Sequence, residues 1–121
     1  LVSESKKKLK NMTFEPYLKT GLMVVAEIRR CENLLLNAVI MFKGDEDRGQ
    51  MIIKQYVHGE GARLYAQTRD MDNHLIWHQP LGDGFMGETK ADDYIKRQRE
   101  FDEDLWVLEV DDPKDIYSVE I

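Results

Sequence analysis

The stretch QMIIKQYVHGEGARLYAQTRDMDNHLIWHQ, residues 50–79, decides the fold of this sequence. It holds three short runs rich in β-branched and aromatic residues, and glycine- or aspartate-rich turns separate them. Runs of this kind at this spacing are typical of consecutive β-strands. The connections are too short for parallel crossovers, so neighbouring strands must run antiparallel. The stretch therefore predicts an antiparallel meander with strands at 50–57, 62–69 and 74–79.

Two more strands are predicted outside this stretch. Residues 38–43 (AVIMFK) are almost wholly apolar, which is typical of a strand buried on both faces. The polar turn 44–49 (GDEDRG) is expected to join this strand to the meander as a hairpin, giving four consecutive strands. A last strand is predicted at 105–110 (LWVLEV).

Two helices are predicted around these strands. Residues 20–33 place apolar side chains at three- and four-residue steps, with Thr20 as N-cap, although the pair Val24-Val25 leaves a strand as the alternative. Residues 89–101 show the same periodicity, with Thr89 as N-cap and Asp92 in a capping-box position. The predicted fold is α+β, an antiparallel sheet of about five strands with both helices packed on one face.

The length of 121 residues supports a single domain. Charge is uneven along the chain, which suggests a basic leader at 1–17, one domain at 18–112 and an acidic tail at 113–121. The first residue is not methionine, so the sequence leaves open whether residues 1–11 are native, processed or added, with Met12 as a candidate start.

Several classes of function are excluded or disfavoured. The apolar run at 21–26 is too short to span a membrane. A net charge of −6 argues against nucleic-acid binding, which depends on neutralising phosphates. The three serines, Ser3, Ser5 and Ser118, lie near the ends without a nucleophile-elbow motif. Cys31 is the only cysteine, lies on the apolar stripe of the first predicted helix and is expected to be a core residue in a reducing compartment.

Candidate cofactor sites are weak. His74 and His78 would chelate a metal on a helix, but four residues of strand separate them by roughly 13 Å. The segment GDGFMG, residues 82–87, matches a dinucleotide fingerprint, but it follows an antiparallel meander and carries acids where phosphate would bind. No catalytic residue, cofactor, resident metal or small-molecule ligand is predicted.

Three segments together resemble a known family. They are LKTGLMVVAEIRRCE (18–32), GDEDRG (44–49) and RQREFDEDLWVLEV (97–110), and they resemble a small alphaproteobacterial family, the domain of unknown function 1491. The resemblance covers roughly 18–112. It implies an α+β protein of the cytoplasm, or of the mitochondrial matrix if the chain is eukaryotic. The family carries no known catalytic residues, so the resemblance transfers none.

By elimination, the sequence favours a non-catalytic protein-interaction module or accessory subunit with a protein partner. Its predicted contact residues are the arginine pair on the first helix and acids of two turns: Arg29, Arg30, Asp45, Glu46, Asp47 and Asp104. The alternative is a small enzyme or ligand-binding protein whose carboxylates hold a divalent ion, with the ligands Asp45, Asp47, Asp102 and Asp104.

Overall fold

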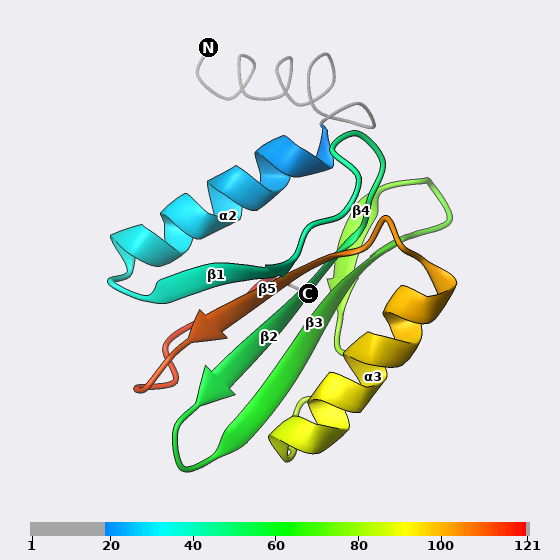
Figure 1. The fold of residues 1–121 in the computed structure, drawn as a ribbon. Helices are drawn as coiled ribbons and strands as arrows, with labels where there is room; N and C mark the ends of the chain where they lie inside the picture. Colours follow the sequence, from blue (N-terminus) through cyan, green and yellow to red (C-terminus); the bar gives the residue numbers. More distant parts are fainter. Residues whose placement is uncertain (1–18, 121) are drawn as a thin grey trace.

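The computed structural model describes residues 19–120 and has two helices and five strands (Figure 1). The helices are α2 (Thr20–Asn33) and α3 (Glu88–Phe101). The strands are β1 (Asn37–Phe42), β2 (Met51–Val57), β3 (Gly61–Arg69), β4 (Leu75–His78) and β5 (Trp106–Asp111). The predicted α+β class with a five-stranded sheet is confirmed. The basic leader at 1–17 lies outside the described residues. Within 19–120, neither helix has the length and hydropathy needed to cross a membrane.

The strands form one sheet in the order β1-β5-β2-β3-β4. Antiparallel pairing of β2 with β3 and of β3 with β4 confirms the meander predicted for residues 50–79. The hairpin predicted between the first two strands is wrong, because β5 lies between them, antiparallel to β1 and parallel to β2. The connection between β1 and β2 can span the roughly 10 Å of two strand spacings. The strongly apolar β5 thereby takes a central, buried position.

The two helices lie on opposite faces of the sheet, so the expectation that both pack on one face is wrong. Met51 and Ile53 of β2 belong to the core beneath α2, whereas Ile52 belongs to the core beneath α3. Successive side chains of a strand point to opposite faces. A strand with three consecutive apolar residues therefore needs a cover on each side, and one helix supplies each cover.

Strand β1 lies at the edge of the sheet and is not buried on both faces, contrary to the prediction. Its apolar side chains are each at least one third exposed, from Val39 to Phe42. On one face of the sheet α3 packs mainly against β2 and β3, and on the other face α2 contacts β1 but leaves Ile40 45% exposed (Figure 1). Apolar composition alone does not distinguish such an edge from a central strand.

Both helices begin without the predicted side-chain caps. Lys19 is the N-cap of α2, and Thr20 instead donates its hydroxyl hydrogen bond to the carbonyl of Gly49. Gly87 is the N-cap of α3, and Asp92 instead accepts a hydrogen bond from Lys54. In each case the polar side chain that was predicted to help cap the helix instead forms a hydrogen bond with a residue far away in the sequence.

The core continues beyond residue 112 into the acidic C-terminal segment. Tyr117 is buried in the core beneath α2. Its hydroxyl donates a 2.6 Å hydrogen bond to Glu27, and its backbone N–H donates to the buried carboxylate of Asp112. Cys31 is buried in the same core, as predicted, and burial raises the pKa of its thiol to about 11.

Candidate functional site: a groove between β1 and α3

The β1 edge of the sheet face that carries α3 is exposed, whereas Val107 of β5 on the same face is fully buried in the core beneath α3. The strand register arranges this face in three rows running from β3 across β2 and β5 to β1. The rows are Ala66–Ile52–Val107–Phe42, Leu64–Lys54–Glu109–Val39 and Ala62–Tyr56–Asp111–Asn37. Helix α3 packs over the β3 and β2 ends of these rows. The β1 end forms one wall of an open groove beside α3.

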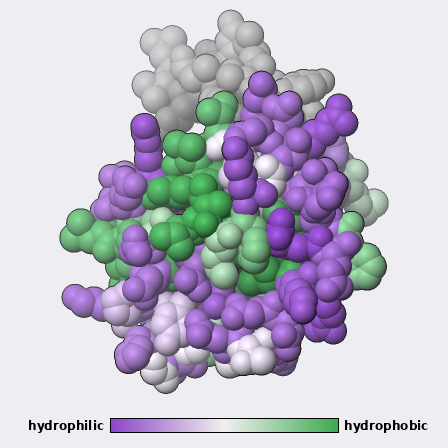
Figure 2. Space-filling view, in the orientation of Figure 1, coloured by the Kyte–Doolittle hydropathy of each residue, from purple (hydrophilic) through white to green (hydrophobic). Residues whose placement is uncertain are grey.

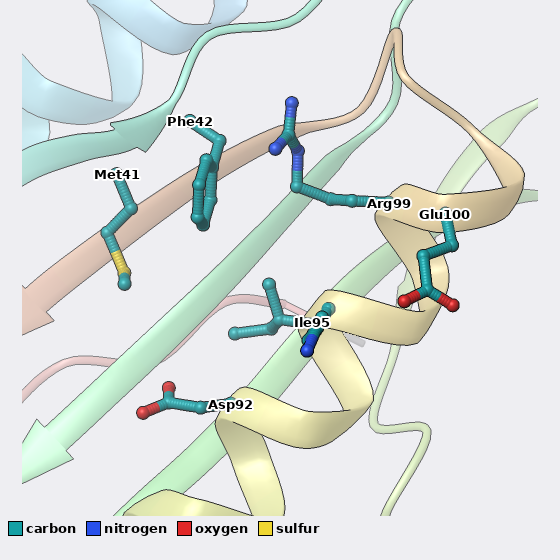
Figure 3. Close-up of a pocket in the computed structure, with 7 residues that line it drawn as sticks. Met41, Phe42, Asp92, Ile95, Arg99 and Glu100 are labelled. Carbon is teal, nitrogen blue, oxygen red and sulfur yellow. The ribbon is translucent and has the colours of Figure 1, made fainter.

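The middle of this groove is apolar and lies between β1 and α3. The groove encloses about 580 Å³ and is lined by Met41, Phe42, Asp92, Ile95, Lys96, Arg99 and Glu100. Figure 3 shows the side chains of Met41 and Phe42 extending from β1 toward Ile95 on α3. The guanidinium of Arg99 lies over the Phe42 ring, 4.2 Å from its centroid. This stacking places a cation at the Phe42 end of the groove.

The other end of the groove is acidic around one buried lysine. The Lys54 side chain is 3% exposed, and its Nζ lies 2.9 Å from Asp92, 3.0 Å from Glu109 and 3.1 Å from Glu88. Burial alone would lower the pKa of Lys54, but the hydrogen bonds to the three carboxylates outweigh it and raise the pKa. One cation thus neutralises one of three carboxylates, and excess negative charge remains.

The side chains that line this groove offer a ligand both apolar and charged contacts. The lining residues of the groove include no serine, cysteine or histidine. The adjacent Lys54 has a raised pKa and stays protonated at neutral pH, so it is not a nucleophile. What the groove offers a ligand is an apolar centre with a cation-bearing end and an acidic end.

The six predicted interaction residues do not form one patch. Arg29 and Arg30 lie in the last half of α2. The acidic turn lies at the start of α2, where the backbone N–H of Gly21 donates to the carbonyl of Glu46. Asp104 is part of that group, since its carbonyl accepts a 3.0 Å hydrogen bond from the backbone N–H of Asp45. About eight residues of helix, roughly 12 Å, separate the two groups.

Several of these six side chains have partners within the chain. Arg30 donates to Glu27 and to the carbonyl of Ser118, and it lies over the Tyr117 ring. One carboxylate oxygen of Asp45 accepts the backbone N–H groups of residues 47 and 48. Asp47 pairs with Lys19 at 3.5 Å, and Glu46 pairs with Lys43 at 3.4 Å, both at the surface. Arg29 is exposed on the outer face of α2. The role of all six in partner binding stays a prediction.

The groove itself was not found from the sequence, because its two walls are about fifty residues apart. The sequence predicts Met41 and Phe42 in a fully buried strand, and no local pattern brings Arg99 next to them. The useful signal was the apolar run of 38–42, which includes no charged residue. Edge strands usually carry such a charge against unwanted pairing.

The alternative metal site is only partly assembled. The two acidic turns do meet, through the backbone contact between Asp45 and Asp104. Their carboxylates, however, accept hydrogen bonds within their own turns. The Asp102 carboxylate accepts one from the backbone N–H of Asp104, and the Asp45 carboxylate accepts one from a backbone N–H of its own loop. Within 19–120, the one group of three or more metal-ligating side chains lies elsewhere, at Asp70, Asp72 and His74.

We expect no change in melting temperature when millimolar magnesium, manganese or calcium is added. An ion that bound only the folded state would raise it by mass action. Thermal denaturation with and without each ion measures this. A rise that disappears in Asp45→Asn with Asp102→Asn would contradict the expectation and restore the alternative function. A rise that persists in that variant would come from another group, such as the one around His74.

Comparison with known proteins agrees with the resemblance drawn from the three sequence segments. The pattern of the family described as "Protein of unknown function (DUF1491)" matches residues 18–119. No curated protein matches the chain.

Solved structures of the same fold include proteins from two bacteria. A crystal structure of a DUF1491 family protein from Caulobacter crescentus CB15 is 33% identical, with a TM-score of 0.70 over 78% of this chain and 88% of that one. An NMR structure of a DUF1491 family protein from the same organism is 35% identical, with a TM-score of 0.66 over 75% of this chain and 82% of that one. A solution structure of a protein from A. tumefaciens is 26% identical, with a TM-score of 0.68 over 87% and 89%. The chain therefore belongs to the DUF1491 family of proteins of unknown function.

Proposed function

We propose that this protein is a non-catalytic protein-interaction module, or an accessory subunit of a larger assembly, that binds its partner through the groove and the adjoining edge of β1. The observation that carries the proposal is the uncovered apolar edge. Val39, Ile40, Met41 and Phe42 are all at least one third exposed on a strand with a free side. Exposed apolar edges of this kind are aggregation-prone unless a partner covers them.

The exposed apolar surface extends beyond the strand. Figure 2 shows hydrophobic residues gathered over α2 and β1, next to the hydrophilic surface around α3. The exposed large apolar side chains of α2, of β1 and of the turn between them are Leu22, Val25, Leu34, Leu35, Val39, Ile40, Met41 and Phe42. Contiguous patches of this sort typically mark protein–protein contact sites. The single buried thiol also supports a reducing compartment, such as the cytoplasm or, in a eukaryote, the mitochondrial matrix.

A photocrosslinking amino acid at position 39 tests this proposal in cells that make the protein. Val39 is 45% exposed on the β1 edge beside the groove, so we expect a discrete protein adduct after irradiation. The matched control is Glu60, which is exposed in the turn between β2 and β3 and should give none. No adduct at position 39, or the same adducts at both positions, would contradict the proposed function.

A further inference from the structure

Strand β1 ends the sheet on one side, and its outer edge has no partner among residues 19–120 (Figure 1). The strand pairs with β5 alone, and its backbone makes no hydrogen bond on the other side within this range. Natural proteins commonly protect a free edge by keeping the strand short or by placing charges or proline in it. The opposite edge strand, β4, has only four residues, whereas β1 has six and includes neither a charge nor a proline. The edge of β1 is therefore the one open to a further strand.

Apolar side chains of β1 are exposed on both faces of the sheet. Val39 lies opposite Glu109, whose carboxylate pairs with Lys54 on the face of α3. Ile40 lies opposite Leu108, which belongs to the core beneath α2. Both side chains are 45% exposed. A ligand or helix docked on one face of the sheet covers only one of them, whereas a strand that continues the sheet beyond β1 covers both.

The register of β1 suits antiparallel pairing with a second β1. The strand is regular from 37 to 40, and a β-bulge follows between Ile40 and Phe42. A two-fold axis perpendicular to the sheet, beside Val39, sets that residue opposite its own counterpart and Ala38 opposite the counterpart of Ile40. Directly opposite residues share a face, so valine contacts valine on one face and a small side chain meets a large one on the other. No like charges are opposed, because 37–42 contains none.

Helix α2 would take part in the same contact. On one flank of the helix, Glu27 and Arg30 line a pocket together with Trp77 of the distant strand β4. Val25 lies about 140° around the helix from Arg30, and so on the flank toward the free edge of β1. It is 48% exposed. Because α2 contacts β1 and the axis keeps both helices on one face, the two copies of this apolar flank would lie side by side.

We propose that β1 pairs antiparallel with β1 of a second copy of this chain, which makes the protein a homodimer and joins two five-stranded sheets into one. This inference rests on the proposed function and identifies its partner. Main-chain hydrogen bonds to a free strand edge are a common mode of recognition. A two-fold contact uses the same surface from both sides, so the surface needs to match only itself. Strand β1 does so, in its length, its lack of charge and its apolar side chains on both faces.

Sedimentation equilibrium of the full chain from about 1 μM to about 1 mM, the range in which weak complexes dissociate, tests the dimer. The mass should rise from 14.2 kDa toward twice that value. Val39→Lys sets two ammonium groups opposite each other across the axis and should weaken the dimer at least tenfold. Ile76→Lys, at a 41% exposed residue of the other edge strand, is the matched control and should dimerise as the unchanged chain does.

Mixing two variants tests the pairing of position 39 with itself. Val39→Lys and Val39→Glu should each stay monomeric alone, because each opposes like charges. An equimolar mixture should form a mixed dimer, because unlike charges then lie opposite each other. The mixture also controls for folding, since a variant that had merely unfolded would not be rescued by the other.

Other results would overturn the inference. They are a mass of 14.2 kDa at every concentration, a dimer that Val39→Lys leaves intact or Ile76→Lys abolishes, or a mixture that stays monomeric. A monomer whose position 39 crosslinks to a different protein would reject the homodimer and leave the proposed function standing. An intramolecular crosslink from position 39 to residues 1–18 would assign the edge to the chain's own leader and reject the homodimer as well.

Discussion

Replacing Tyr117 with alanine is expected to lower the free energy of unfolding by about 3–5 kcal/mol, the usual cost of truncating a large buried aromatic residue. The side chain is 2% exposed and packs edge-to-face on Tyr65 at 6.1 Å between ring centroids. Its hydroxyl donates to Glu27, and Arg30 lies over its ring. Urea denaturation, followed by circular dichroism, measures the loss.

Two neighbouring changes serve as controls for Tyr117→Ala. Tyr117→Phe keeps the ring and removes only the hydrogen bond to Glu27, so it should cost about 1 kcal/mol. Ile116→Ala, at a half-exposed residue, should change stability by less than about 0.5 kcal/mol. If Tyr117→Ala cost no more than Ile116→Ala, the C-terminal segment would not be part of the core.

Replacing Lys54 with methionine is expected to destabilise the fold by about 2 kcal/mol at neutral pH. Removing one partner of a fully buried ion pair typically costs about 3–5 kcal/mol. We expect less here, because the three carboxylates are one third to one half exposed and water can partly solvate them. Without the lysine, the carboxylates of Glu88, Asp92 and Glu109 would repel one another.

The pH dependence of this variant follows from the same charges. Folding raises the pKa of Lys54, so its own stabilisation is complete below the ordinary value of 10.5 and is lost as the pH rises above it.

Chemical denaturation at several pH values, with Lys43→Met as the matched control, measures both effects of Lys54→Met. Lys43 pairs with Glu46 at the surface, and its loss should cost less than about 0.5 kcal/mol. Equal effects of Lys54→Met and Lys43→Met would contradict the buried charge cluster.

The elements of this fold were largely predictable because they depend on local periodicity. The helix at 20–33 was predicted with the bounds that α2 has, and the bounds of the five strands and of α3 differ from the predicted ones by one residue at one or both ends. Turn residues such as the aspartates of 44–49 and 70–73 mark where the chain must reverse, and that chemistry is local as well. The burial of Cys31 followed from its place on the apolar stripe of one helix.

The arrangement of these elements was not predictable from the same pattern. A strand with an apolar run, such as β1, has the same sequence pattern whether it lies at the centre of a sheet or at its edge. The insertion of β5 between β1 and β2 depends on contacts between residues sixty positions apart. The acidic composition of 113–121 suggested a solvated tail, yet it contains Tyr117, whose burial depends on α2 and β3.

The sequence by itself determined the class of the fold, the family and the meander, since each depends on the order and spacing of residues along the chain. Only the tertiary structure decided which strands are neighbours, which face each helix covers and that β1 stays exposed beside α3. The charged and apolar ends of the groove exist because the register aligns Phe42, Val107, Val39 and Glu109 across two strands. Such alignment arises from long-range packing free energy, which no local pattern of residues encodes.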